Sequence, residues 1–115
     1  MLDTTTFNDC LPADSVVTST TTAKRTSRAV RVWLENKQLL EWAGFFAGSS
    51  YTATYGIGTI TLTLDSAGTG RVSVCRRGDK LRPIIDLHSS KVAASLTAGK
   101  ECLVTYGTCT ITIKQ

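Results

Sequence analysis

The 115-residue chain has little histidine, proline or aromatic content: one His, two Pro, two Trp, three Tyr and three Phe. A single histidine excludes a compact enzyme built on several histidines. The four cysteines, Cys10, Cys75, Cys102 and Cys109, show no CxxC spacing, and one histidine cannot complete a Cys2His2 site. The sequence therefore predicts no metal site and no cofactor. The first residues lack a basic segment followed by an apolar one, so we expect a cytoplasmic protein with buried free thiols.

Charge is absent from residues 42–64, a stretch long enough to span a bilayer. This stretch contains several glycines, serines and threonines, and Thr alternates with aliphatic residues from Thr59 to Leu64. Strict alternation is typical of a half-buried strand, whereas a membrane helix is apolar on all sides. We predict sheet here, and no membrane as a partner.

Threonine is abundant, with nineteen residues in the chain. Its β-branched side chain suits a pleated, half-buried surface and disfavours an all-helical bundle. The length corresponds to one domain, and the formal net charge of +4 is compatible with an acidic partner. The composition thus predicts a strand-dominated α+β domain.

Short motifs recur at one offset of 51 residues. The recurring pairs are Ala47-Gly48 and Ala98-Gly99, Thr54-Tyr55-Gly56 and Thr105-Tyr106-Gly107, and Thr59-Ile60-Thr61 and Thr110-Ile111-Thr112. A fixed offset of this kind indicates internal duplication. We predict a flexible N-terminal arm at 1–15, a first repeat at 16–64, a linker at 65–70 and a second repeat at 71–115, with one core shared by both repeats.

Each repeat is predicted as a strand, a short helix and a β-hairpin, giving two interleaved β-α-β-β units. The first repeat has a strand at 29–34, a helix at 37–43 and a hairpin at 51–55 and 59–64. The second has a strand at 81–87, a helix from 89 or 90 to 96 and a hairpin at 103–106 and 109–113. An extra strand precedes each repeat, at 15–19 and 71–75. Asn36 is expected to cap the first helix, and Gly44 to follow its end.

The first repeat also carries a family motif, formed by Arg31-Val32-Trp33-Leu34, then Leu39-Leu40-Glu41-Trp42-Ala43-Gly44-Phe45, then Gly48 and a Thr-rich hairpin. This motif resembles the SymE-like toxin family of the AbrB-type swapped-hairpin superfamily, whose typical pattern runs L-x-G-K-W-L-x-x-A-G-F-x-x-G. The spacing from Leu34 to Ala43 is one residue longer than in that pattern, and Leu39 replaces its Trp. The Gly-Lys pair falls on Lys37-Gln38, and the second repeat lacks Ala-Gly-Phe.

The resemblance implies an architecture in which hairpins from two units complete one sheet-rich body. AbrB-like proteins generally form it from two chains, so two repeats in one chain imply a covalent pseudo-dimer. The superfamily mostly binds DNA, and SymE-like members are described as toxins linked to RNA cleavage or nucleoid binding. The resemblance leaves both activities open.

Basic residues are concentrated in two segments, each just before the first strand of a repeat. They are Lys24, Arg25, Arg28 and Arg31 in the first segment, and Arg71, Arg76, Arg77, Lys80 and Arg82 in the second. In a two-fold pseudo-dimer the segments would occupy equivalent places and form one basic face or two matched arms. Lys and Arg bind phosphate backbones by releasing counterions, so we predict a nucleic-acid-binding surface.

No catalytic residue is predicted, with His88 the weak candidate. Asp86, His88 and Ser90 alternate, but residues of one strand rarely form a triad, and a polar strand-to-helix junction is the preferred explanation. A ribonuclease would use His88 as a lone base, with Arg82 or Lys91 stabilising the phosphate.

The aromatic residues are assigned to two environments. Trp33, Trp42, Phe45 and Phe46 are expected in the core, and Tyr55 and Tyr106, near equivalent turns, are expected to be exposed.

We hypothesise a DNA-binding regulator of AbrB or SymE type that uses the two basic clusters. The alternatives are an RNA-directed toxin of SymE type acting as an endoribonuclease, and a phage- or plasmid-borne inhibitor that binds a host protein. The chain would be a monomeric pseudo-dimer or a homodimer.

Overall fold

The computed structural model describes residues 17–25 and 30–115; the predicted arm at 1–15 lies outside these ranges. The elements in chain order are β1 (Val17–Thr22), β2 (Lys24–Arg25), β3 (Val30–Leu34), α1 (Lys37–Trp42), β4 (Ser50–Gly56), β5 (Thr59–Leu64), β6 (Gly70–Arg71), β7 (Ser73–Arg77), β8 (Lys80–Leu87), α2 (Ser90–Ser95), β9 (Glu101–Gly107) and β10 (Thr110–Lys114). The strand-dominated α+β class is confirmed. The stretch without charge forms strands β4 and β5 over most of its length, and no helix of the described residues is long and apolar enough to cross a membrane.

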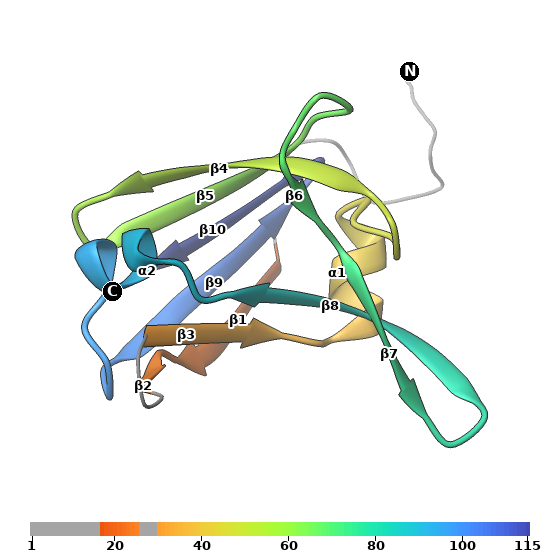
Figure 1. The fold of residues 1–115 in the computed structure, drawn as a ribbon, viewed down its shortest axis with the longest axis horizontal. Helices are drawn as coiled ribbons and strands as arrows, with labels where there is room; N and C mark the ends of the chain where they lie inside the picture. Colours follow the sequence, from red (N-terminus) through yellow and green to blue (C-terminus); the bar gives the residue numbers. More distant parts are fainter. Residues whose placement is uncertain (1–16, 26–29) are drawn as a thin grey trace.

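Two antiparallel sheets make up the body (Figure 1). The larger has the order β1-β9-β10-β5-β4-β6 and curls into a half-barrel. The smaller has the order β2-β3-β8-β7, in which β2 is only two residues long. The helices α1 and α2 lie at opposite ends of the molecule (Figure 1).

The predicted hairpins are confirmed at the offset of 51 residues: β4 and β9 are equivalent, as are β5 and β10. The two hairpins meet where β5 pairs with β10, so that Ile60 lies opposite Ile113. The residues equivalent to these two, Ile111 and Leu62, also lie opposite each other. Exchanging the halves of the chain therefore reproduces the register of this central pairing.

The outer strands of the larger sheet are exchanged between the halves. Strand β1, from the first half, pairs with β9 of the second, and β6, from the second half, pairs with β4 of the first. Strand β3 of the first half also pairs with the equivalent strand of the second half, β8, and this pairing places Trp33 opposite Asp86. Each half therefore completes a sheet that begins in the other.

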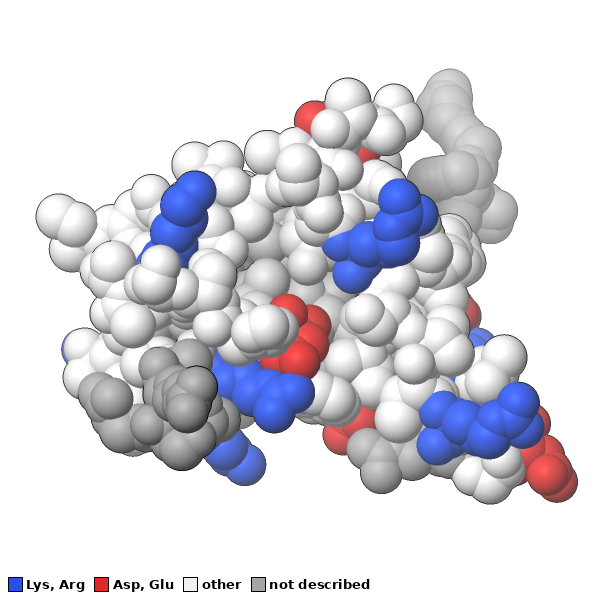
Figure 2. All heavy atoms as spheres, viewed as in Figure 1, with Lys and Arg blue, Asp and Glu red and all other residues white. Residues whose placement is uncertain are grey.

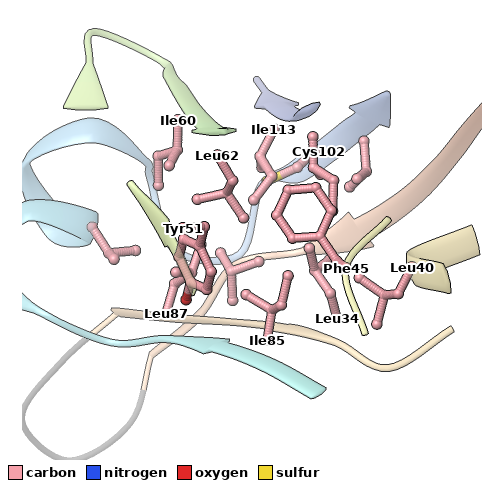
Figure 3. Close-up of a cluster of buried hydrophobic side chains, with 14 of the residues drawn as sticks. Leu34, Leu40, Phe45, Tyr51, Ile60, Leu62, Ile85, Leu87, Cys102 and Ile113 are labelled. Carbon is pink, nitrogen blue, oxygen red and sulfur yellow. The ribbon is translucent and has the colours of Figure 1, made fainter. Parts of the chain in front are cut away.

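A single hydrophobic core draws on both halves, as the close-up in Figure 3 shows. Its fully buried members include Phe45, Ile60, Leu62, Ile111 and Ile113. In β5 and β10 the aliphatic residues point into this core, and the alternating threonines lie on the other side of the strands. Hydrophobic burial shared in this way makes the two halves depend on each other.

Helix α1 begins and ends as its sequence predicts. The Leu39 N–H donates to Asn36 Oδ1 at 3.1 Å, and Gly44 follows the last turn with a φ of 93°. Ser89 stands at the N-cap of α2, but its side chain makes no capping hydrogen bond. Each helix has six residues, too few to be stable without tertiary contacts.

The extra strands differ from their predicted bounds. The segment predicted at 15–19 is described from Val17 and extends to Thr22, and the strand at 71–75 is interrupted at Val72. The Val72 side chain is buried, while its backbone bonds Gly48 and Ser49. At the buried Val72 the chain leaves the larger sheet, which contains β6, and enters the smaller sheet, which contains β7. Prediction from the sequence missed this break because the residues on both sides of Val72 continue the alternating pattern of a strand.

Candidate nucleic-acid interface

The pairing of β2, β3 and β8 gathers basic residues on one side of the smaller sheet. Directly opposed residues of antiparallel strands point to the same side, and so do residues two apart on one strand. Lys24 lies opposite Arg31, and Trp33 follows two residues later on β3. Trp33 in turn lies opposite Asp86 of β8. We call this side the outer face; it carries Lys24, Arg31, Trp33, Lys80, Arg82 and Asp86. Val32, Leu34, Ile85 and Leu87 occupy the core side.

Arg31 is held by two neighbours on the outer face. Its Nε and Nη2 donate to the two carboxylate oxygens of Asp86 at 2.7 and 2.6 Å, and its guanidinium lies 4.8 Å from the centre of the Trp33 ring. The hydrogen bond from Arg31 to Asp86 raises the pKa of the arginine. The charge of Arg31 is therefore largely balanced, although its side chain stays 40% exposed.

Lys80 and Arg82 lie on the hairpin formed by β7 and β8, which extends away from the body at the lower right of Figure 1. Both side chains are exposed and make no ion pair with another described residue. Figure 2 shows basic side chains on this hairpin, with acidic atoms at its tip, apart from the other basic patches in that view. Lys80 lies six residues from Asp86, the residue that Arg31 bonds, which corresponds to about 20 Å along the strand.

The structure divides the predicted basic residues instead of uniting them. Arg76 lies opposite Leu81, on the other side of the hairpin from Lys80 and Arg82. Arg71, in β6, donates to the Gly48 carbonyl at 3.2 Å and lines a separate groove. Arg28 lies outside the described residues, as do the side chains of Arg25 and Arg77.

The two basic clusters fall on equivalent strands but not at equivalent positions. When the halves are exchanged, the pair Lys24 and Arg31 maps onto Ser73 and Ile84, which also lie opposite each other. The equivalence of the two segments therefore does not extend to their individual basic residues. Backbone pairing preserves the position of a strand, and it places no restriction on which exposed side chain stands there.

His88 lies in a second place, an open groove of about 500 Å³ beside β4. Tyr55, Arg71 and Lys91 line the same groove, whereas Arg82 does not. Asp86 is bonded to Arg31, and within the described residues no hydrogen bond joins His88 to Asp86 or to Ser90. The arrangement brings two cations and an imidazole together without a triad. Of the two cations that the sequence offered as partners of His88, only Lys91 lines this groove, and its Nζ lies 5.8 Å from the centre of the Tyr55 ring.

Several aromatic assignments are corrected by the structure. Phe45 is fully buried and Trp42 packs against the core, as expected, but Trp33 and Phe46 are 37% and 53% exposed. Tyr106, expected at the surface, is buried, and this burial raises its pKa to about 12. Trp33 is on the outer face because it alternates with the buried residues of β3. That alternation was the signal available in the sequence.

The cysteines occupy three different environments. Cys102 is buried, Cys75 is half-buried and Cys109 is exposed, and all three are free thiols; Cys10 lies outside the described residues. The expectation of buried thiols is thus wrong for Cys109, which stands in the turn between β9 and β10. No group of three or more His, Cys, Asp and Glu side chains within the described ranges is arranged to hold a metal ion.

The chain was compared with family models, curated proteins and solved structures. No family model, no curated protein and no solved structure matches the chain.

Proposed function

We propose that this protein binds nucleic acid, duplex DNA in the first place, through the outer face and without catalysis. The observation that carries the proposal is the placement of Lys24, Lys80 and Arg82 on one side of one sheet, with exposed Trp33 between them. The three cations are exposed. Such cations neutralise phosphates, and an aromatic ring beside them offers a surface for sugar or base contact.

We infer that the architecture is a swapped-hairpin pseudo-dimer of AbrB or SymE type. The motif over 31–64 supports it, as does the exchange of β1 and β6 between the halves. The preference for DNA over RNA follows from this inferred relationship, because the superfamily mostly binds DNA. The repeats at 16–64 and 71–115 would then be the two units of the pseudo-dimer.

The dimensions of the outer face suit a short contact with a duplex. A length of about 20 Å corresponds to about six base pairs at 3.4 Å per step. Three exposed cations would release about three counterions, so the logarithm of affinity should fall with the logarithm of salt concentration with a slope of about −3. The contact is one of phosphate positioning, which predicts weak sequence preference.

The test is fluorescence anisotropy of labelled duplex DNA titrated at several salt concentrations. The variant Lys80→Gln/Arg82→Gln should weaken binding and reduce the salt slope by about two. Arg76→Gln is the matched control, because it removes a cation from the same hairpin but from the opposite side; its effect should be small. Equal losses in the two variants, or no binding by the natural protein at low salt, would contradict the proposal.

Single-stranded DNA and RNA of the same length belong in the same titration. If RNA binds more tightly than duplex DNA, RNA is the preferred ligand, and the outer face remains the proposed site. A cleavage assay on the RNA, with His88→Ala alongside, separates binding from ribonuclease chemistry.

A further inference from the structure

The two equivalent edges of the larger sheet are covered to different extents. On one side, the six residues of β1 pair with β9 from Glu101 to Tyr106. On the other, β6 pairs with β4 only at Ser50 and Tyr51. Among the described residues, Thr52–Gly56 therefore has a strand neighbour, β5, on one edge alone. Figure 1 shows β4 continuing past β6 with no strand drawn along its outer edge.

The backbone groups along this edge point outward. The Asp65 N–H donates to the Ser50 carbonyl, which places the bonding groups of Ser50 toward β5. Bonding direction alternates along an antiparallel strand, so the N–H and C=O groups of Ala53 and Tyr55 face the uncovered edge. No hydrogen bond within the described part of the chain uses them. Unpaired groups of this kind are a template for another strand.

The groove of about 500 Å³ described above runs along the same edge, and its charge indicates what fits. Arg71 and Lys91 line it, and the carboxylate that also lines it, Asp86, is already bonded to Arg31. A strand with carboxylates would complement this charge. A second copy of β4 would instead bring two sets of these cations together, which disfavours self-pairing.

We propose that the edge of β4 over Thr52–Gly56 binds an extended, acidic segment of a partner protein as an added antiparallel strand. The molecule contains its own template: β1 pairs in this way with β9, where Val17 lies opposite Tyr106 and Ser19 opposite Val104. At the offset of 51, Tyr106 and Val104 correspond to Tyr55 and Ala53. This site adjoins the outer face at Asp86, which lines the groove, but the proposal does not depend on nucleic-acid binding. Main-chain hydrogen bonds supply its affinity, and Arg71 and Lys91 select for acidic residues.

The experiment uses the full chain and the capped peptide Glu-Val-Thr-Ser-Thr-Glu, whose central four residues repeat 17–20. Amide hydrogen exchange is followed by NMR. In the free protein the Tyr55 and Ala53 amides should exchange faster than those of Tyr106 and Val104, and saturation with peptide should slow them at least about tenfold. The same peptide with an N-methylated serine lacks the N–H that would bond Ala53, and it should not protect these amides.

Charge reversal provides the second arm. Lys91→Glu, at an exposed position, should weaken peptide binding about tenfold, and Lys100→Glu, an exposed lysine before β9, should leave it unchanged. A peptide with two lysines in place of its glutamates should bind the natural protein more weakly. The proposal is overturned if saturating peptide leaves the exchange of Ala53 and Tyr55 unchanged, if N-methylation has no effect, or if Lys91→Glu and Lys100→Glu bind alike.

Discussion

The two halves of this chain share the register of their central strands and differ in how far equivalent residues are covered. Tyr55 and Tyr106 illustrate the difference, since they are equivalent in sequence and register. Tyr106 is 2% exposed, in a strand that β1 covers along its length, whereas Tyr55 is half-buried and lines the groove beside β4. Repetition of a motif therefore conserves the direction of a side chain, but not what the neighbouring segments place over it.

The same contrast holds in the smaller sheet. The first half contributes Arg31 and Trp33 to the outer face, whereas the equivalent positions of the second half hold Ile84, which is buried, and Asp86. The Arg31–Asp86 ion pair joins the halves across β3 and β8. Divergence between repeats thus creates contacts that two identical units could not form.

The largest expected effect tests whether the shared core makes the halves one unit. Leu62→Ala and Ile113→Ala alter equivalent, fully buried residues, and each should lower the free energy of unfolding by about 2–5 kcal/mol. Urea denaturation followed by tryptophan fluorescence and by circular dichroism should show one coincident transition in both variants. Separate transitions for the two probes would mean that each half folds by itself.

The next effect concerns the pH dependence of the free energy of unfolding and tests the burial of Tyr106. Burial holds the pKa of Tyr106 at about 12, above its unfolded value of 10.0, so the stability it contributes is complete below about pH 10 and is lost as pH rises toward 12. Urea unfolding at about pH 9 and about pH 11 should show a smaller decline for Tyr106→Phe than for the natural protein, by about 1.3 kcal/mol. An undiminished decline in Tyr106→Phe would contradict the assignment.

The equivalent hairpin turns should respond in opposite directions. Gly58 and Cys109 occupy the same turn position with φ values of 70° and 61°, a conformation that side chains disfavour. Gly58→Ala should cost about 1–2 kcal/mol, although the added Cβ would meet no close atom. Cys109→Gly should raise stability by a smaller amount, because relief of strain exceeds the added chain entropy. Thermal denaturation of both variants measures the difference, and destabilisation by Cys109→Gly would refute it.

The smallest expected effect concerns the helix caps. Asn36→Ala removes the hydrogen bond to the Leu39 amide and should cost about 1 kcal/mol. Ser89→Ala removes no side-chain capping bond and should cost only about a few tenths. Chemical denaturation of the two variants compares them; equal losses would show that Ser89 caps α2 in solution.

Prediction from the sequence succeeded where a feature depends only on neighbouring residues and on the backbone conformation that they favour. The Asn36 cap, the Gly44 termination and both hairpins follow from residue type and spacing, because capping, positive φ and alternation are local properties. It failed for Trp33, Tyr106 and Cys109, whose exposure depends on what packs against them. Residue type favours burial for Trp33 and Cys109, whereas the position of Tyr106 near a turn favoured exposure.

The candidate sites divide in the same way. The abundance of Lys and Arg near 24–31 and 71–82 is visible in the sequence, but the register decided which of them share a face. It placed Lys80 and Arg82 on the outer face and Arg76 on the reverse of the hairpin. The uncovered edge of β4 had no sequence signal, because it arises from the different lengths of β1 and β6.

The sequence by itself determined the duplicated strand order, the alternation that builds the core and the net positive charge of this protein. Only the tertiary structure decided which strands pair across the halves, where each cation lies and which edge stays open. The physical reason is that alternation and turn chemistry act over a few residues, whereas burial and edge pairing depend on segments about fifty residues apart.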